Sequence, residues 1–383
     1  MIPKDASKPI RNDGAPAKVA HQPQSSRRQD LPALTGVRGV AACVVAVFHM
    51  NYWFYTGGWS PDGPGTVLAT VFRTGYLGVD LFFALSGYVI AGAYLEAFRR
   101  PSRGAYAHFM IRRFARIWPL HVATLLLYIG APACRAPGDL AGNLLMVQAW
   151  GLIGHVTCNE PSWSISGEWF AYLAFPGLAW LLLRSERRWA ALALAALGLG
   201  GLGLLAWLGG SNSLDVTFSL GFVRAACGFT IGAALCRSFA DVKPHLAFDG
   251  CGILVIAAVG GLAMAGAPDL LVAGLFGPLV LCIALAAGPL RAILGAAPVV
   301  WLGEISYSLY LWHHFLIDHL KGLGGAIATP AAVGLALCLI VGVAALSRRW
   351  IEQPARTGII ALLSGLPQLF ARTSVEPAPA PRR

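Results

Sequence analysis

Charged side chains are scarce in this chain: they make up 12% of its 383 residues, whereas hydrophobic residues make up 56%. So little charge, with a mean hydropathy of +0.63, excludes an ordinary soluble globular protein. Acidic residues are the scarcer kind, with 18 Asp and Glu against 29 Lys and Arg. The net charge of +11 still does not indicate nucleic-acid binding, because the basic residues cluster beside apolar runs, a pattern that orients a chain in a membrane.

The cysteines give no sign of a metal site. The sequence has no C-x-x-C pair and no cluster of His and Cys with metal-ligand spacing. Most of the eight cysteines lie in apolar segments, where their expected role is packing. Cys134 and Cys158 differ, because both fall in one connecting segment of about residues 131–163. A disulfide between them is expected if that side of the membrane is oxidising.

Ten apolar segments are long enough to span a bilayer. Basic residues mark every second loop between them, and cytoplasmic loops are the basic ones. The sequence therefore predicts an all-α integral membrane protein, a bundle of about ten transmembrane helices with both termini cytoplasmic, in the cell inner membrane. The segments are residues 33–52, 74–95, 114–131, 164–183, 189–208, 217–235, 250–267, 270–287, 298–317 and 329–347.

The composition also predicts the domain organisation. Residues 1–30 lack apolar periodicity and are expected to form a disordered cytoplasmic tail. Residues 31–356 form the transmembrane domain, and residues 357–383 a C-terminal cytoplasmic segment with a Pro-rich tail. The first apolar run is too long and too far from the N-terminus for a cleaved secretory signal.

Two ionisable residues, Arg38 and His49, lie in the first apolar segment. Eleven residues at about 100° each place them within roughly 20° of one helix face, about 16 Å apart along the axis. Ionisable residues inside a membrane span are functional candidates by default. A catalytic role is favoured for His49, because an imidazole exchanges protons near neutral pH. The alternative is an Arg that reaches the membrane surface and a His bonded to a nearby backbone carbonyl.

The second apolar segment carries Asp80 and Ser86. Asp80 lies in its outer half, so it could meet His49 and fix the tautomer of the imidazole. The alternative for Asp80 is a cap at the start of a helix. Ser86, beside Gly87, is expected to be a residue of helix packing and is a weaker candidate.

Four further ionisable residues are functional candidates. Arg113 and Arg116 share one helix face at the cytoplasmic end of the third segment, and paired guanidinium groups suit a phosphate-rich ligand. The alternative is that they set the topology or contact lipid headgroups. Glu168, about one turn into the fourth segment, and Arg224, in the middle of the sixth, each need an ionic partner or a water-filled cavity. The alternative for both is a structural ion pair between spans.

These motifs together resemble the acyltransferase 3 family of integral membrane acyltransferases, in family order over about residues 31–356. No fused hydrolase-like domain of the kind carried by some members is expected. The matching pieces are Arg38-x10-His49, Gly78-Val-Asp-Leu-Phe-Phe-x-Leu-Ser-Gly87, Arg113-x-x-Arg116 with Pro119, Trp163-Ser-Ile-Ser-x-Glu168, Gly303-x-Ile-Ser-Tyr-Ser-Leu-Tyr-Leu-Trp-His313 and Glu352-x-Pro354.

The resemblance implies transfer of an acyl group, most often acetyl, from cytoplasmic acyl-CoA to a hydroxyl of a glycan. Acyl-CoA is then a co-substrate, and no bound cofactor or metal is expected. The expected partners are the donor, a glycan or lipid-linked glycan acceptor and membrane lipids, with no nucleic acid. The expected catalytic residues are His49, Asp80 and Glu168; the donor-binding residues are Arg38, Arg113 and Arg116; further candidates are Arg224, Ser86 and His313.

The acceptor and two rival functions stay open at this point. By family frequency an exopolysaccharide or O-antigen is favoured, and a small molecule such as a macrolide is the alternative acceptor. A secondary transporter would also carry ionisable residues at mid-membrane, but it usually shows inverted repeats, and none is evident. A non-catalytic assembly protein would not require buried His, Asp and Glu.

Overall fold

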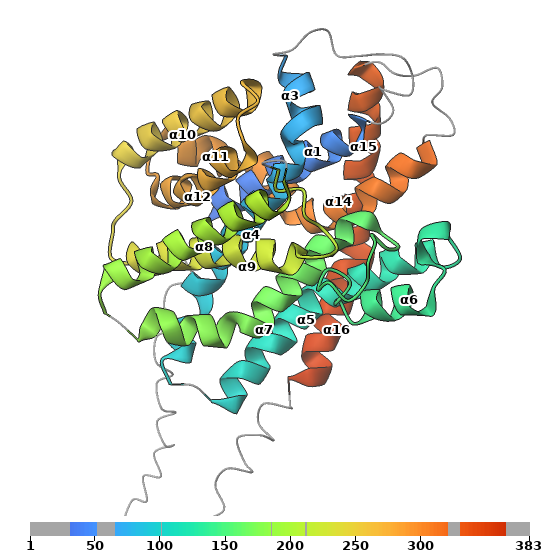
Figure 1. Ribbon diagram of the computed structural model, residues 1–383, viewed down its shortest axis with the longest axis horizontal. Coiled ribbons are helices and arrows are strands. Elements are labelled where there is room, and N and C mark those ends of the chain that lie inside the picture. The colour runs from blue at the N-terminus through green and yellow to red at the C-terminus, as the bar shows by residue number, and fades with distance from the viewer. Residues whose placement is uncertain are drawn as a thin grey trace, which may run out of the picture. The chain divides into compact units, whose positions relative to one another are not determined.

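The computed structural model describes residues 31–51, 66–100, 102–184, 186–210, 213–320 and 330–364. Over these residues the chain is helical and contains no β-strand, as Figure 1 shows, so the predicted all-α fold is confirmed. The tail predicted for residues 1–30 lies outside the described residues, and so do residues 365–383 of the C-terminal segment.

Helices cover each of the ten predicted apolar segments, although their ends differ. The third helix begins eleven residues before the predicted segment, at Arg103, because a Ser102 side chain accepts a hydrogen bond from the backbone of Ala105 and caps that end. The helices are α1 (Pro32–His49), α3 (Val67–Thr74), α4 (Gly78–Tyr94), α5 (Arg103–Leu125), α6 (Pro137–Leu144), α7 (Trp163–Leu183), α8 (Arg188–Leu208), α9 (Gly221–Ser238), α10 (Leu246–Met264), α11 (Asp269–Gly274), α12 (Phe276–Leu285), α13 (Pro289–Leu294), α14 (Ala297–Leu320), α15 (Pro330–Ser347) and α16 (Gln353–Leu363).

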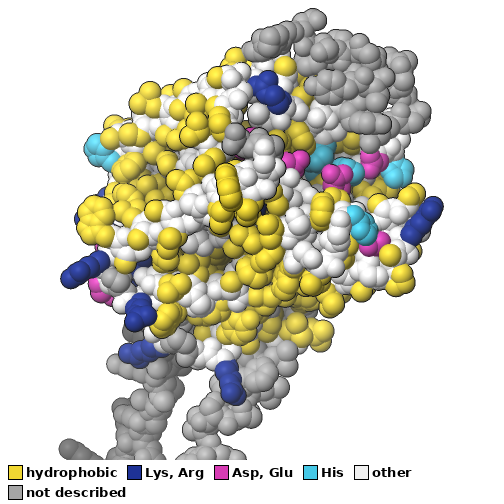
Figure 2. All heavy atoms as spheres, in the orientation of Figure 1, with side chains coloured by type: hydrophobic (Ala, Val, Ile, Leu, Met, Phe, Trp, Pro, Cys, Tyr) yellow, Lys and Arg dark blue, Asp and Glu magenta, His cyan; other side chains and the backbone are white. Residues whose placement is uncertain are grey.

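Five helical stretches of the described residues are long and apolar enough to cross a membrane. They are Pro32–His49, Val67–Tyr94, Arg188–Leu208, Leu246–Met264 and Ala331–Leu363. Hydrophobic side chains also cover most of the face drawn in Figure 2, where the visible His, Asp and Glu side chains gather mainly toward one side. These features suit a membrane protein, while the count of ten spans and the cytoplasmic termini stay predictions.

The turn after α10 is short, as the sequence required. Gly266 adopts a φ of +69°, in the left-handed region that glycine enters without a Cβ clash. Its backbone N–H donates to the carbonyl of Ala263, and that of Ala267 donates to Leu262. This closes α10 in a left-handed cap, so α11 and α12 can return beside α10.

Glycines set the two helix pairs that position the site. α1 packs against α14, where a side chain at Gly39 or Gly303 would collide with the backbone of the partner helix. α4 packs against α9, where a side chain at Gly87 or Gly232 would collide with a carbonyl group of the partner. Small residues let membrane helices approach this closely. The polar residues of α1 therefore face those of α14, and the polar residues of α4 face those of α9.

Candidate active site

Two histidine side chains, His49 at the end of α1 and His313 in α14, lie against each other. The ring centroids are 4.8 Å apart, and Nε2 of His313 lies 3.2 Å from Nδ1 of His49. Each Nδ1 also lies near a backbone carbonyl oxygen, at 2.9 Å for Val45 and 2.6 Å for Tyr310. Because a carbonyl only accepts, we assign the hydrogen of both neutral rings to Nδ1. The single Nδ1–H of His49 is then shared between the Val45 carbonyl and Nε2 of His313, and Nε2 of His49 keeps a lone pair that can take a proton.

His49 also lines a cavity of about 310 Å³. His314, Glu160 and Asp215 supply further polar groups to its wall. His314 stands edge-on to His49, with the ring centroids 5.6 Å apart, and its Nε2 lies 3.3 Å from a carboxylate oxygen of Glu160. The hydrogen bond from His314 holds the pKa of Glu160 below its usual value. The cavity thus places a candidate base beside a charged pair.

Asp80 pairs with Arg224 rather than with His49, so the expected Asp80–His49 contact is wrong. The two carboxylate oxygens of Asp80 accept from Nε and Nη2 of Arg224, at 2.9 and 2.6 Å. The reason is the close approach of α4 to α9, which leaves the end of α1 facing α14. Both side chains are buried, and the Arg224 guanidinium lies over the rings of Trp163 and Tyr76, at 5.1 and 5.8 Å. The structural ion pair, given as the alternative for Arg224, is confirmed.

Glu168 binds two hydroxyl groups, whereas the sequence analysis had given an ionic partner or a water-filled cavity as its possible surroundings. Its Oε1 accepts from Oγ of Ser86, at 2.7 Å, and from the hydroxyl of Tyr172 one turn along α7. Ser86 therefore does more than pack beside Gly87. Hydroxyl groups can satisfy a carboxylate in a span without cancelling its charge, so Glu168 still attracts nearby cations.

Two of those cations are Arg38 and Arg113, which interact electrostatically with Glu168. The guanidinium of Arg113 lies 5.3 Å from the ring centre of Tyr94 and donates to its hydroxyl at 3.2 Å. The buried Nε atoms of both arginines have no hydrogen-bond partner among the described residues. A buried N–H without a partner is unfavourable, so an oxygen-rich ligand in this place would be stabilised.

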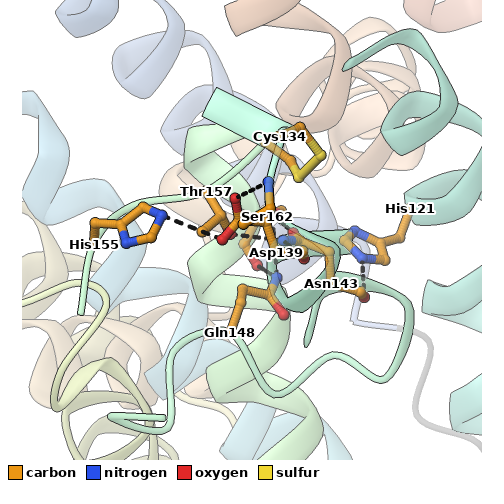
Figure 3. The surroundings of a disulfide bond; sticks show 10 residues. His121, Cys134, Asp139, Asn143, Gln148, His155, Thr157 and Ser162 are labelled. Atoms are coloured by element: carbon orange, nitrogen blue, oxygen red, sulfur yellow. Dashed lines mark hydrogen bonds and ion pairs between the residues drawn. A yellow bond between two sulfur atoms is a disulfide. The ribbon is translucent and has the colours of Figure 1, made fainter. Parts of the chain in front are cut away.

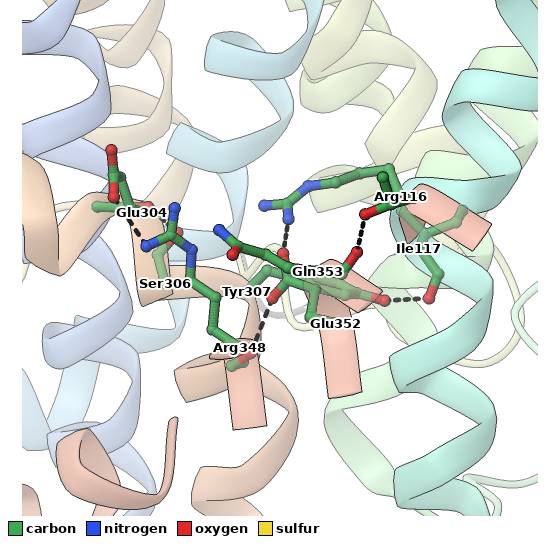
Figure 4. Close-up of polar contacts among 11 residues, drawn as sticks. Arg116, Ile117, Glu304, Ser306, Tyr307, Arg348, Glu352 and Gln353 are labelled. Atoms are coloured by element: carbon green, nitrogen blue, oxygen red, sulfur yellow. Dashed lines mark hydrogen bonds and ion pairs between the residues drawn. The ribbon is translucent and has the colours of Figure 1, made fainter. Parts of the chain in front are cut away.

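Arg116 differs from Arg113, although the two were expected to act together. Its guanidinium forms an ion pair with Glu352, which also accepts from Ser308 at 2.8 Å. It lies over the ring of Tyr307, 5.1 Å from the ring centre. Figure 4 shows these groups together where the π-helical turn Arg348–Glu352 meets α5. The ion pair with Glu352 thus fixes the position of Arg116 and neutralises its charge.

A family model described as "Acyltransferase domain" matches residues 31–349, which carry all of these groups except Glu352. The chain belongs to the acyltransferase 3 family. It is therefore an acyltransferase. No solved structure matches the chain.

Curated relatives differ in how much of their length this acyltransferase covers. The acyltransferase MdmB of Streptomyces mycarofaciens is 29% identical over 358 residues, which cover 81% of this chain and 87% of that protein. The peptidoglycan O-acetyltransferase OatA of Listeria monocytogenes is 26% identical, over 86% of this chain and 56% of its own. The putative peptidoglycan O-acetyltransferase YrhL of Bacillus subtilis is 25% identical, over 85% and 55%. The chain thus spans just over half the length of the two relatives named for peptidoglycan.

The acyltransferase domain also contains the expected disulfide, which joins Cys134 to Cys158. Figure 3 shows the polar side chains that surround it. Asn143 donates to the hydroxyl of Thr157 at 2.6 Å, and His155 lies 3.2 Å from a carboxylate oxygen of Asp139. These contacts attach His155 and Thr157 to α6, shortly before the chain reaches Glu160 and the cavity.

Four charged or titratable residues that the site description uses escaped the sequence analysis: Glu160, Asp215, His314 and Glu352. His314 follows the candidate His313 directly, and Glu352 lies in a motif that the resemblance had picked out without giving it a role. Glu160 stands in a connecting segment, where a carboxylate is ordinary and carries no signal. Among the described residues, no group of three or more His, Cys, Asp or Glu could hold a metal ion.

Proposed function

We propose that this protein is a multi-pass O-acyltransferase of the cell inner membrane that moves an acetyl group from cytoplasmic acyl-CoA to a hydroxyl of an envelope or exported glycan. The observation that carries the proposal is the division of polar groups along α1. The buried Nε of Arg38 has no hydrogen-bond partner among the described residues, and the base His49 lines a cavity about 16 Å further along the same face. In the proposed reaction the anionic donor needs the cationic surroundings of Arg38, and the neutral acceptor needs the cavity beside His49.

On the donor side, Arg113 and Arg38 bind the phosphate groups of acyl-CoA. Guanidinium groups suit phosphate because each fork can donate two hydrogen bonds. Arg116 contributes less charge, because Glu352 is bound to it. We assign Arg116 and Glu352 the role of holding α5 against the π-helical turn, so that Arg113 keeps its place between Tyr94 and Tyr172.

On the acceptor side, Nε2 of His49 removes the proton of the acceptor hydroxyl. The hydroxyl oxygen attacks the thioester carbonyl carbon, so that a C–O bond forms and the C–S bond breaks. The imidazolium then returns the proton to the thiolate, and the products are the ester and the free thiol of coenzyme A. His313 supports this step, because its Nε2 accepts from Nδ1–H of His49, which becomes a stronger donor as His49 gains charge. An acyl-His49 intermediate is the alternative route.

The names of the relatives support an acetyl group and a glycan, since two are named as peptidoglycan O-acetyltransferases. A small-molecule acceptor such as a macrolide is the second candidate. The share of the relative's length that is covered favours it: the chain covers 87% of MdmB, and MdmB is not named for a glycan.

The test uses the purified full chain in proteoliposomes with acetyl-CoA labelled in the acetyl group. We expect label to enter a glycan extracted from the envelope and one thiol to be released for each ester formed. The His49→Ala variant, inserted at the same level, is the matched control. Thiol release without label in any glycan or macrolide, or equal labelling by the variant, would refute the proposal.

A further inference from the structure

The cavity beside His49 has walls of two chemical kinds. Aromatic rings of Phe48, Tyr76 and Trp163 supply apolar surface. Carboxylates of Glu160 and Asp215 supply hydrogen-bond acceptors, and the side chain of Glu160 is 52% exposed. Ligand cavities usually combine such apolar surface with a few polar groups that fix orientation. At about 310 Å³ the cavity is at the small end of that class, so it admits one ring-sized unit.

The positive charges of the same wall are already neutralised. Arg224 is the only Arg or Lys among the described residues that line the cavity. The carboxylate of Asp80 balances its charge and binds Nε and Nη2, while the buried Nη1 has no hydrogen-bond partner among the described residues. His314 lies between two carboxylates, 3.3 Å from Glu160 and 3.1 Å from Asp318. No unpaired cation is therefore left in the described wall to bind an anionic ligand.

Asp215 is the second carboxylate in the wall of the cavity. It lies in the connection that leads into α9, whereas Glu160 lies in the one that leads into α7. Desolvation raises the pKa of Asp215, and Arg224 opposes that rise. A neutral hydroxyl can donate to such a carboxylate at no electrostatic cost, whereas an anionic group would be repelled.

We infer that this cavity is the acceptor subsite and that it selects an uncharged polyol ring, such as a neutral pyranose, over an acidic sugar. The ring lies against the aromatic walls, its hydroxyl groups donate to Glu160 and Asp215, and one hydroxyl reaches Nε2 of His49. Aromatic faces carry partial negative charge and so attract the C–H groups of such a ring. This inference rests on the proposed function, because it assumes that His49 acts on a hydroxyl.

The experiment measures binding without chemistry, in detergent and without donor, by saturation-transfer NMR. The probes are a methyl hexopyranoside, the matching methyl hexuronide and the matching amino sugar. We expect the full chain to bind the neutral sugar at least about 10-fold more tightly than the hexuronide. The variant Glu160→Gln with Asp215→Asn should weaken the neutral sugar by about 10-fold, since two charge-assisted hydrogen bonds become neutral ones. It should bind the hexuronide more tightly than the unaltered chain does.

Asp241→Asn is the matched control, because Asp241 follows the far end of α9 and its loss should change neither affinity. Equal binding of the neutral and acidic sugars by the unaltered chain would overturn the inference, as would tighter binding of the amino sugar. An unchanged preference in the double variant would overturn it too. Selective binding without acetyl transfer would instead refute the proposed function, and transfer without this preference would leave that function standing.

Discussion

Breaking the buried ion pair between Asp80 and Arg224 should destabilise the protein strongly. Both carboxylate oxygens of Asp80 are bound, at 2.9 and 2.6 Å, and the side chains are 3% and 1% exposed. Asp80→Asn keeps the size of the side chain but removes its charge, so Arg224 is left buried and unneutralised. Removing one partner of a buried pair costs about 3–5 kcal/mol, because the other charge stays without compensation.

Replacing both partners should be far less harmful than replacing one. In Asp80→Leu with Arg224→Met, apolar groups of similar volume occupy the same space, and such replacements are often neutral or stabilising. In the double-mutant cycle with the single variants Asp80→Leu and Arg224→Met, the coupling energy should therefore be large, and the double variant should regain most of the stability. The matched control is Glu186→Gln: Glu186 lies 3.2 Å from Arg237, but its side chain is 80% exposed. Loss of that surface pair should cost less than about 1 kcal/mol.

The assay is thermal unfolding in detergent, followed by tryptophan fluorescence. For a chain of this size we expect Asp80→Asn to lower the midpoint by roughly 5–10 °C and the control by much less. A midpoint for Asp80→Asn equal to that of the control would refute the reasoning. A double variant whose loss of stability equals the sum of the losses in the two single variants would refute it as well. A folded double variant that transfers no acetyl would show that the pair also serves catalysis.

Two further predictions concern the proposed reaction, and a third concerns the disulfide. His49→Ala should fold and insert but lower acetyl transfer by about 10²–10⁴-fold, since it removes the base; near-normal turnover would remove His49 from the mechanism. Arg113→Ala should raise the KM for acetyl-CoA, and Arg113→Lys should rescue only in part, because Lys offers a point charge without a fork. An inverted topology of the Arg113 variants, seen with loop reporters, would favour a topological role instead. Replacing Cys134 and Cys158 by Ser should lower stability by roughly 3 kcal/mol in the chain-entropy view, because the bridge closes 24 residues. If both native thiols alkylate without a reductant, the bridge is absent from the purified protein.

The helices could be predicted from the sequence because each depends on a local property. A run of about 20 apolar residues satisfies its backbone only as a helix in lipid, whatever its neighbours are. The facing of Arg38 and His49 follows from helical geometry in the same way. The disulfide could be predicted because Cys134 and Cys158 share one short connecting segment.

The partners of the ionisable residues could not be predicted, because they depend on which helices pack together. Asp80 pairs across α4 and α9, whereas the sequence analysis weighed only a contact with His49 on α1 and a helix cap. Gly228 and Gly232, which let α9 pack closely against α4, are visible in the sequence. Which residues they contact is known only once the helices are packed. The pair of Arg116 and Glu352 joins residues 236 positions apart, for which helical spacing says nothing.

The packing of α1 limits how donor and acceptor can meet. Gly36 and Gly39 fix one part of α1 against α13 and α14, and the other part lies against Gly75 and Gly78. α1 is one continuous helix, and both of these parts are packed against neighbouring residues. The distance of about 16 Å between Arg38 and His49 along the helix therefore cannot shorten unless the surrounding helices repack. In the proposed reaction, a donor whose phosphates stay with Arg38 would therefore extend its acyl-bearing arm along α1 to His49, whereas the acceptor would need only to enter the adjoining cavity.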